Sequence, residues 1–78
     1  KIKIFPNPTD GNVTVDLSEL KRGNYSINVY DTTGKKILTQ TSSDSINLLD
    51  LRNNTKGIYI ISVSSKKSII ASEWVVVK

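Results

Sequence analysis

Apolar and polar residues alternate along most of the chain with a period of two, which is typical of β-strands that bury one face. The alternating segments are rich in β-branched residues and cover residues 1–5, 12–17, 24–30, 35–41, 45–51, 58–64 and 69–78. Gly, Asn, Asp, Ser and Pro fill the intervals, where turns are expected. No window of twelve residues shows helical periodicity. About seven strands, spaced roughly ten residues apart, predict an all-β antiparallel sandwich.

Specific turn signals separate the predicted strands. Pro6 and Pro8 cannot donate the hydrogen bonds of a strand ladder, so they should end the first strand. Asp10-Gly11 follows, and we expect Gly11 to adopt a positive φ in a tight turn. Residues 31–34, with the sequence Asp-Thr-Thr-Gly, are typical of a hairpin turn. The polar connector 18–23 has room for one helical turn after Ser18.

Two segments share one pattern, Gly-x-Tyr-x-Ile-x-Val, at residues 23–29 and 57–63. In both, the glycine would supply a turn conformation, and three alternating side chains would then face the core. Each of these strands should be central, either one in each sheet or side by side in one sheet. The inward residues predicted are Tyr25, Ile27, Val29, Tyr59, Ile61 and Val63.

The composition disfavours most chemistry. A chain of 78 residues is one domain with a thin core, burying roughly 60–65% of the surface that it exposes when unfolded. It has no cysteine, and no histidine to activate a serine or to bind a metal. Asp50, Asn53 and Asn54 offer oxygen ligands for calcium but lack the alternating acidic residues of a calcium loop. We therefore expect no enzyme activity, no cofactor and no metal site.

The net charge and hydropathy also disfavour two classes of partner. The formal charge of +4 comes from basic residues scattered mostly as pairs at expected turns, Lys21-Arg22, Lys35-Lys36 and Lys66-Lys67. A nucleic-acid interface would cluster them on one face among aromatic residues, which are only 6% of this chain. No segment approaches the roughly 20 apolar residues of a membrane-spanning helix, and no signal peptide opens the chain. Because methionine is absent, we expect a module of a longer protein.

Three groups of residues, in order, carry a resemblance to a known family. Pro-Asn-Pro-x-x-Gly occupies residues 6–11, a Gly-x-Tyr strand followed by Tyr-Asp-x-x-Gly-Lys occupies 23–35, and a second Gly-x-Tyr strand precedes a basic-ended last strand within 57–78. Together they resemble the type A C-terminal sorting domains of type IX secretion cargo, over essentially the whole chain. The matching residues are Pro6, Asn7, Pro8, Gly11, Gly23, Tyr25, Tyr30, Asp31, Gly34, Lys35, Gly57, Tyr59 and Lys78.

The resemblance implies an immunoglobulin-like sandwich that serves as an address label at the end of a larger secreted protein of a Gram-negative bacterium. Such labels are read in the periplasm by shuttle proteins and the translocon, carry the cargo across the outer membrane, and are typically removed by a cell-surface sortase. We expect residues 1–78 to form this single domain as a monomer. Where the family often has a lysine, this chain has Trp74, which leaves Lys78 as the only cation of the last strand.

The last segment departs from the alternation, because residues 74–77, Trp-Val-Val-Val, are apolar at every position. Either both faces of this strand are covered, or one face is an exposed apolar stripe. A sandwich this small has little material to cover an outer face, which favours the exposed stripe. Ile58 and Ile60 are out of phase with Tyr59 in the same way, so pairing of the two strands would create one outward patch.

We predict that the translocon reads this patch together with the C-terminal residues, while a strand that only completes the sheet is the structural alternative. The edge of the strand is also a candidate for β-augmentation by a partner. By the alternation of the family, Val75 and Val77 point inward and Trp74, Val76 and Lys78 point outward. The predicted recognition residues are Ile58, Ile60, Trp74, Val75, Val76, Val77 and Lys78.

A second interpretation is an immunoglobulin-like accessory module of a secreted hydrolase that binds carbohydrate or spaces domains. Carbohydrate sites usually present exposed, coplanar aromatic rings. Here Trp74, Tyr30 and Phe5 would have to converge to form such a platform.

Overall fold

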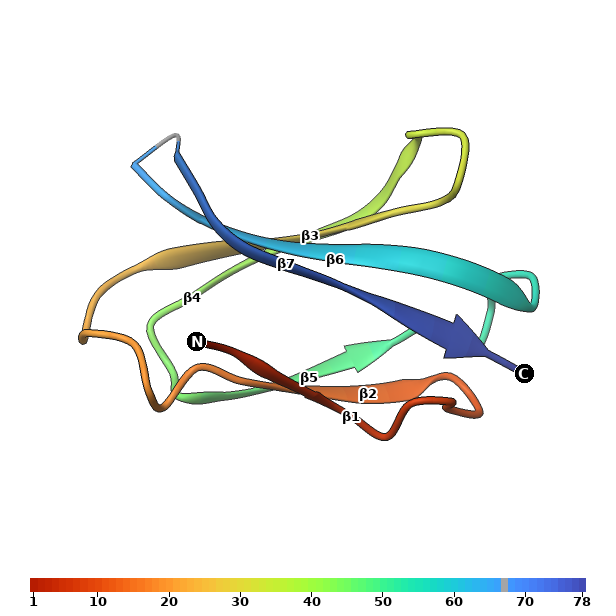
Figure 1. Cartoon of the computed structure of the whole chain (residues 1–78), viewed down its shortest axis with the longest axis horizontal. Coiled ribbons are helices and arrows are strands. Elements are labelled where there is room, and N and C mark those ends of the chain that lie inside the picture. The colour runs from red at the N-terminus through yellow and green to blue at the C-terminus, as the bar shows by residue number, and fades with distance from the viewer. Residues whose placement is uncertain (67) are drawn as a thin grey trace.

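The computed structural model describes residues 1–66 and 68–78 and shows a sandwich of two antiparallel sheets (Figure 1). Lys67, from the basic pair predicted at a turn, lies outside the described residues. One sheet has the order β1-β2-β5, and the other has the order β4-β3-β6-β7. The bounds are β1 Lys3–Phe5, β2 Asn12–Asp16, β3 Tyr25–Tyr30, β4 Lys36–Ser42, β5 Ile46–Asp50, β6 Gly57–Ser65 and β7 Ser68–Val77.

The predicted all-β sandwich is confirmed, and each predicted strand matches an observed one within two residues at either end. The connections from β2 to β3, β4 to β5 and β5 to β6 pass from one sheet to the other, as in immunoglobulin-like sandwiches. Among the described residues, no helix has the length and apolar composition needed to cross a membrane.

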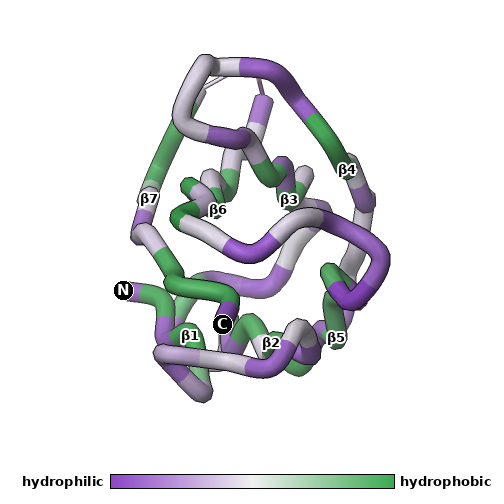
Figure 2. The backbone as a smooth tube through the Cα atoms, turned by 90° about the vertical axis from the view of Figure 1, so that its right-hand side faces the viewer, coloured by the Kyte–Doolittle hydropathy of each residue, from purple (hydrophilic) through white to green (hydrophobic). Residues whose placement is uncertain are grey.

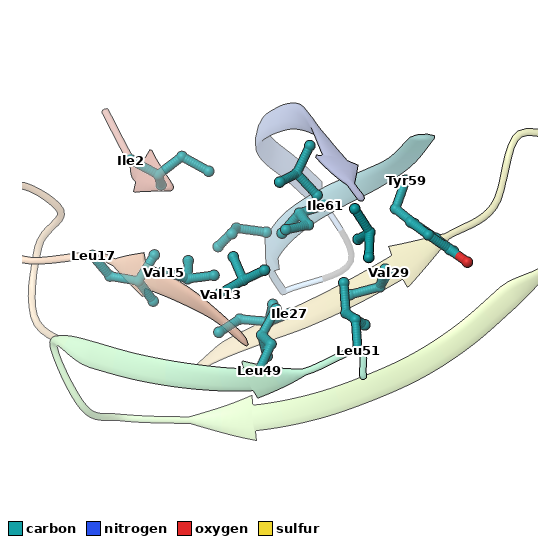
Figure 3. Close-up of a cluster of buried hydrophobic side chains, with 13 residues drawn as sticks. Ile2, Val13, Val15, Leu17, Ile27, Val29, Leu49, Leu51, Tyr59 and Ile61 are labelled. Atoms are coloured by element: carbon teal, nitrogen blue, oxygen red, sulfur yellow. The ribbon is translucent and has the colours of Figure 1, made fainter. Parts of the chain in front are cut away.

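The core lies between the sheets and is built largely from alternate residues of the strands, with Ile2, Leu17 and Leu51 from just outside them (Figure 3). The two strands with the repeated pattern, β3 and β6, are paired side by side in the centre of the four-stranded sheet, with Ile27 opposite Val63 and Val29 opposite Ile61. Tyr25 is half-buried, and the other five predicted inward residues are buried, so the core assignment is confirmed. The buried apolar residues are Ile2, Val13, Val15, Leu17, Ile27, Val29, Leu49, Leu51, Tyr59, Ile61, Val63, Val75 and Val77.

The turns follow the sequence signals in most places. Gly11 and Gly34 have φ angles of 127° and 90°, as their turns require. The Asp31 carboxylate accepts hydrogen bonds from the backbone amides of Thr33 and Lys35, and this closes the hairpin between β3 and β4. Gly57 also has a positive φ of 148°.

In the connector before β3, the expected turn conformation of Gly23 was wrong, and the helical turn considered after Ser18 is a single hydrogen-bonded turn. Gly23 has no positive φ, and a Cβ atom placed there would have open space around it, so this position does not require glycine. After Ser18, the Leu20 amide donates to the Leu17 carbonyl and closes one turn, but no helix forms. The Ser18 amide instead donates to the Asp16 carboxylate, an arrangement that competes with helical hydrogen bonding.

The first and last strands lie on the same side of the sandwich. Viewed from the end where β7 finishes, β7 and β1 lie on one side and β4 and β5 on the other (Figure 2). Thr9, in the loop between β1 and β2, forms a parallel bridge with Val77 at the end of β7. This contact places the Pro-Asn-Pro loop against the last strand.

Candidate recognition surface at the end of the last strand

Strands β6 and β7 pair so that two apolar cross-strand pairs lie on the outer face of the four-stranded sheet. Ile58 is opposite Val76, and Ile60 is opposite Trp74. Trp74 is 57% exposed and Ile58 is 47% exposed, while Ile60 and Val76 are half-buried. We call Ile58, Ile60, Trp74 and Val76 the terminal apolar face.

The alternate residues of the same strands face the core. Val75 is fully buried and Val77 is 4% exposed, and Val75 lies opposite the buried Tyr59. The predicted inward and outward phases of β7 are therefore confirmed in the geometry, while recognition by a partner stays a prediction. Lys78 follows β7 and is exposed at the end of the face.

The row next to the terminal apolar face is polar, although Ile69 and Ile70 at the start of β7 are also exposed. The next cross-strand row, towards the start of β7, contains Asn28, Ser62 and Ser72. Asn28 accepts a hydrogen bond of 2.7 Å from the Thr39 hydroxyl, so this part of the sheet is a polar network. This polar row therefore separates the terminal apolar face from Ile69 and Ile70 at the other end of β7.

The outer edge of β7 in this region is already occupied. The Asn7 carboxamide donates from Nδ2 to the Trp74 carbonyl at 3.1 Å and accepts at Oδ1 from the Val76 amide at 2.9 Å. The Thr9 amide donates to the Val76 carbonyl at 2.8 Å, and the Lys78 amide donates to the Thr9 carbonyl at 2.9 Å. The prediction that this edge would be open to β-augmentation is therefore wrong for residues 74–78, because the first loop uses its hydrogen-bonding groups.

Sequence reasoning missed the partnership between the Pro-Asn-Pro motif and the last strand. Thr9 is 1% exposed, its hydroxyl donates to the Asn12 carbonyl, and the same oxygen accepts from the Gly11 amide. These bonds fix the loop that carries Asn7. The only signal in the sequence was that the two motifs occur in the same chain.

The two tyrosines of the repeated pattern make structural hydrogen bonds. The Tyr25 hydroxyl donates to the Lys21 carbonyl, and the Tyr59 hydroxyl donates to the Thr55 carbonyl. Each tyrosine thus ties its strand to the connector four residues upstream, which explains why the repeated pattern contains tyrosine as well as aliphatic residues. Pro6 and Pro8 are exposed in the first loop, next to Asn7.

The candidate calcium ligands are not arranged as a metal site. The Asp50 carboxylate is bound by the Arg52 guanidinium, with both oxygens 2.9 Å from guanidinium nitrogens. These side-chain hydrogen bonds, together with one from the Arg52 amide, lower the pKa of Asp50 to about 2. Within residues 1–66 and 68–78, no three acidic side chains gather as metal ligands would.

The aromatic side chains do not converge on a carbohydrate platform. Tyr30 and Trp74 lie in one cross-strand row of the four-stranded sheet, on either side of Ile60. Phe5 lies on the outer face of the other sheet, opposite Thr14. The three-residue platform that this interpretation needs is therefore absent from the described structure.

A comparison with known families agrees with the three motifs. The family described as "Secretion system C-terminal sorting domain" matches residues 3–78, which include every strand and the Pro-Asn-Pro loop. No curated protein matches the chain. The chain thus belongs to the secretion system C-terminal sorting domains, which are the sorting signals of type IX secretion.

Proposed function

We propose that residues 1–78 are the address label of a larger secreted protein and that the translocon recognises the terminal apolar face. The label is read in the periplasm, where shuttle proteins and the translocon bind it, and a cell-surface sortase then removes it. Family membership supports a role in export across the outer membrane. Family members are secretion signals and are not catalysts.

The exposure of the terminal apolar face is the observation that carries this proposal. Burying an apolar side chain the size of Trp74 or Ile58 is worth roughly 1.5–3 kcal/mol, and both side chains are about half exposed in the domain, so a partner that covered them would gain part of this free energy. Large exposed apolar residues that adjoin one another on a small domain are typical of interaction sites.

Export of a reporter tests the proposed function. Residues 1–78, fused to the C-terminus of a reporter that reaches the periplasm of a host with type IX secretion, should direct the reporter out of the cell. The reporter without the fusion should remain in the periplasm, and the reporter with an established sorting domain should be exported. Retention of the 1–78 fusion beside an exported positive control would refute the proposal.

A further inference from the structure

The hydrogen bonds between the first loop and the end of β7 have a residue-specific component. Two of the four are made by the backbone of Thr9, which any residue except proline could replace. The other two are made by the side chain of Asn7, 67 and 69 residues away from its partners. Two of the four hydrogen bonds between the first loop and β7 therefore depend on the identity of residue 7.

Only a carboxamide of this length satisfies both partners at once. Nδ2 supplies a donor for the Trp74 carbonyl and Oδ1 supplies an acceptor for the Val76 amide, so the side chain imitates a peptide group of a neighbouring strand. An aspartate would keep the acceptor but would place a carboxylate oxygen against the Trp74 carbonyl. A leucine of similar shape would leave both backbone groups of β7 without this partner.

The flanking residues hold the carboxamide in place. Pro6 and Pro8 restrict the backbone on either side of Asn7, and the buried Thr9 anchors the loop through its hydroxyl. Asn7 is exposed, so its contribution lies in these hydrogen bonds and not in core packing. Trp74 and Val76, the residues that it holds, supply half of the terminal apolar face.

We propose that Asn7 is a positioning residue for export: it clasps the end of β7 to the first loop, so that a partner meets the terminal apolar face only on a chain in which this loop is docked on the last strand. This inference rests on the proposed function, in which the partner reads that face. It also defines the partner's surface. Because the edge at residues 74–78 is closed, the partner binds with apolar side chains across the face and does not add a strand there.

Amide hydrogen exchange measured by NMR on the 78-residue chain tests the clasp itself. In Asn7→Leu, the Val76 amide should exchange at least ~5-fold faster than in the unmodified chain, as expected for the loss of one hydrogen bond. The Ile61 amide in the central strand β6 should be unchanged, which shows that the sandwich remains folded. Asn7→Asp retains the acceptor and should give a smaller increase. Equal protection of Val76 in Asn7→Leu and the unmodified chain would overturn the clasp.

The same variants in the reporter assay test the positioning role. Asn7→Leu should reduce export at least ~5-fold, while the control Asn53→Ala, an exposed asparagine in the turn before β6, should export normally. Faster exchange at Val76 combined with normal export would overturn the positioning role. If the unmodified 1–78 fusion is not exported, the proposed function and the positioning role both fail, but the exchange result still decides whether the clasp exists.

Discussion

Gly11 and Gly34 both have positive φ angles, but the space around them differs. A Cβ atom on Gly11 would lie 2.7 Å from Arg52 Cγ and 2.9 Å from Arg52 Cα, whereas one on Gly34 would meet nothing within 4 Å. Gly11→Ala should therefore lower the free energy of unfolding by about 2–3 kcal/mol, through backbone strain and collision with a neighbouring backbone.

Gly34→Ala is the matched control, because it has the strain without the collision. Gly34→Ala should lower the free energy of unfolding by about 1 kcal/mol. Chemical denaturation of the two variants and the unmodified chain measures both values. Equal costs for the two glycines would show that the loop of Gly11 moves away from Arg52 and that the close approach has no energetic weight.

At the scale of single residues, local patterns could be predicted from the sequence and distant contacts could not. The positive φ of Gly11 and the Asp31 turn follow from residue types whose preferences are local. The role of Asn7 depends on Trp74 and Val76, and no local preference reveals partners almost 70 residues away. Gly23 shows the opposite error, because a glycine before a strand need not occupy a special conformation.

Strands β6 and β7 present two faces whose substitution should have separable effects. The double variant Trp74→Ser, Val76→Thr removes apolar surface from the outer face, so it should abolish reporter export while changing the free energy of unfolding by less than ~1 kcal/mol. Val75→Ala, on the buried face of the same strand, should lower the free energy of unfolding by about 2 kcal/mol by leaving a cavity.

Ser72→Ala lies in the polar row of the same outer face and is the control for surface changes that spare the terminal apolar face. It should be exported normally. Export assays on the three variants, combined with denaturation of the purified chains, give both quantities. Normal export of the Trp74→Ser, Val76→Thr variant would contradict recognition of this face. A Val77-Lys78 deletion is a poorer test, because Val77 is also part of the core.

At the scale of elements, alternation was sufficient to predict all seven strands, since one buried face imposes a period of two, whereas the phase of the apolar end of β7 came from the family resemblance. It left open whether β3 and β6 share a sheet, because the pattern inside a strand does not specify its neighbour. The open edge assigned to β7 was wrong for a related reason. The residues that occupy this edge, Asn7 and Thr9, belong to a loop whose polar sequence gives no strand signal.

Acid should destabilise the whole molecule within a defined pH range. Hydrogen bonds from Ser18, Thr33 and Arg52 lower the pKa values of Asp16, Asp31 and Asp50 respectively, the last to about 2. When the pH falls below 3.8, the ordinary pKa of an aspartate, the unfolded chain therefore binds more protons than the folded one. At pH values well above 3.8 these carboxylates make their full contribution to the free energy of unfolding. This contribution is lost as the pH falls towards 2.

Thermal unfolding between pH 2 and 7 measures this dependence. The midpoint should be constant from about pH 5 to pH 7, since the chain has no histidine, and should fall below about pH 4. Replacing the three aspartates by asparagine should flatten the acid limb of the curve. A midpoint that does not change down to pH 2.5 would contradict the link between these hydrogen bonds and stability.

The contact between Thr9 and Val77 has a kinetic consequence for the whole chain. A hydrogen bond that joins residues so far apart is formed only after a long loop has closed, and the entropy of closure is lost before the bond can compensate for it. All-β domains dominated by such non-local pairings fold in milliseconds to seconds, much more slowly than helical domains of the same size. Until that loop closes, Asn7 and Thr9 cannot hold the end of β7, so the terminal apolar face is not yet assembled on an unfolded chain.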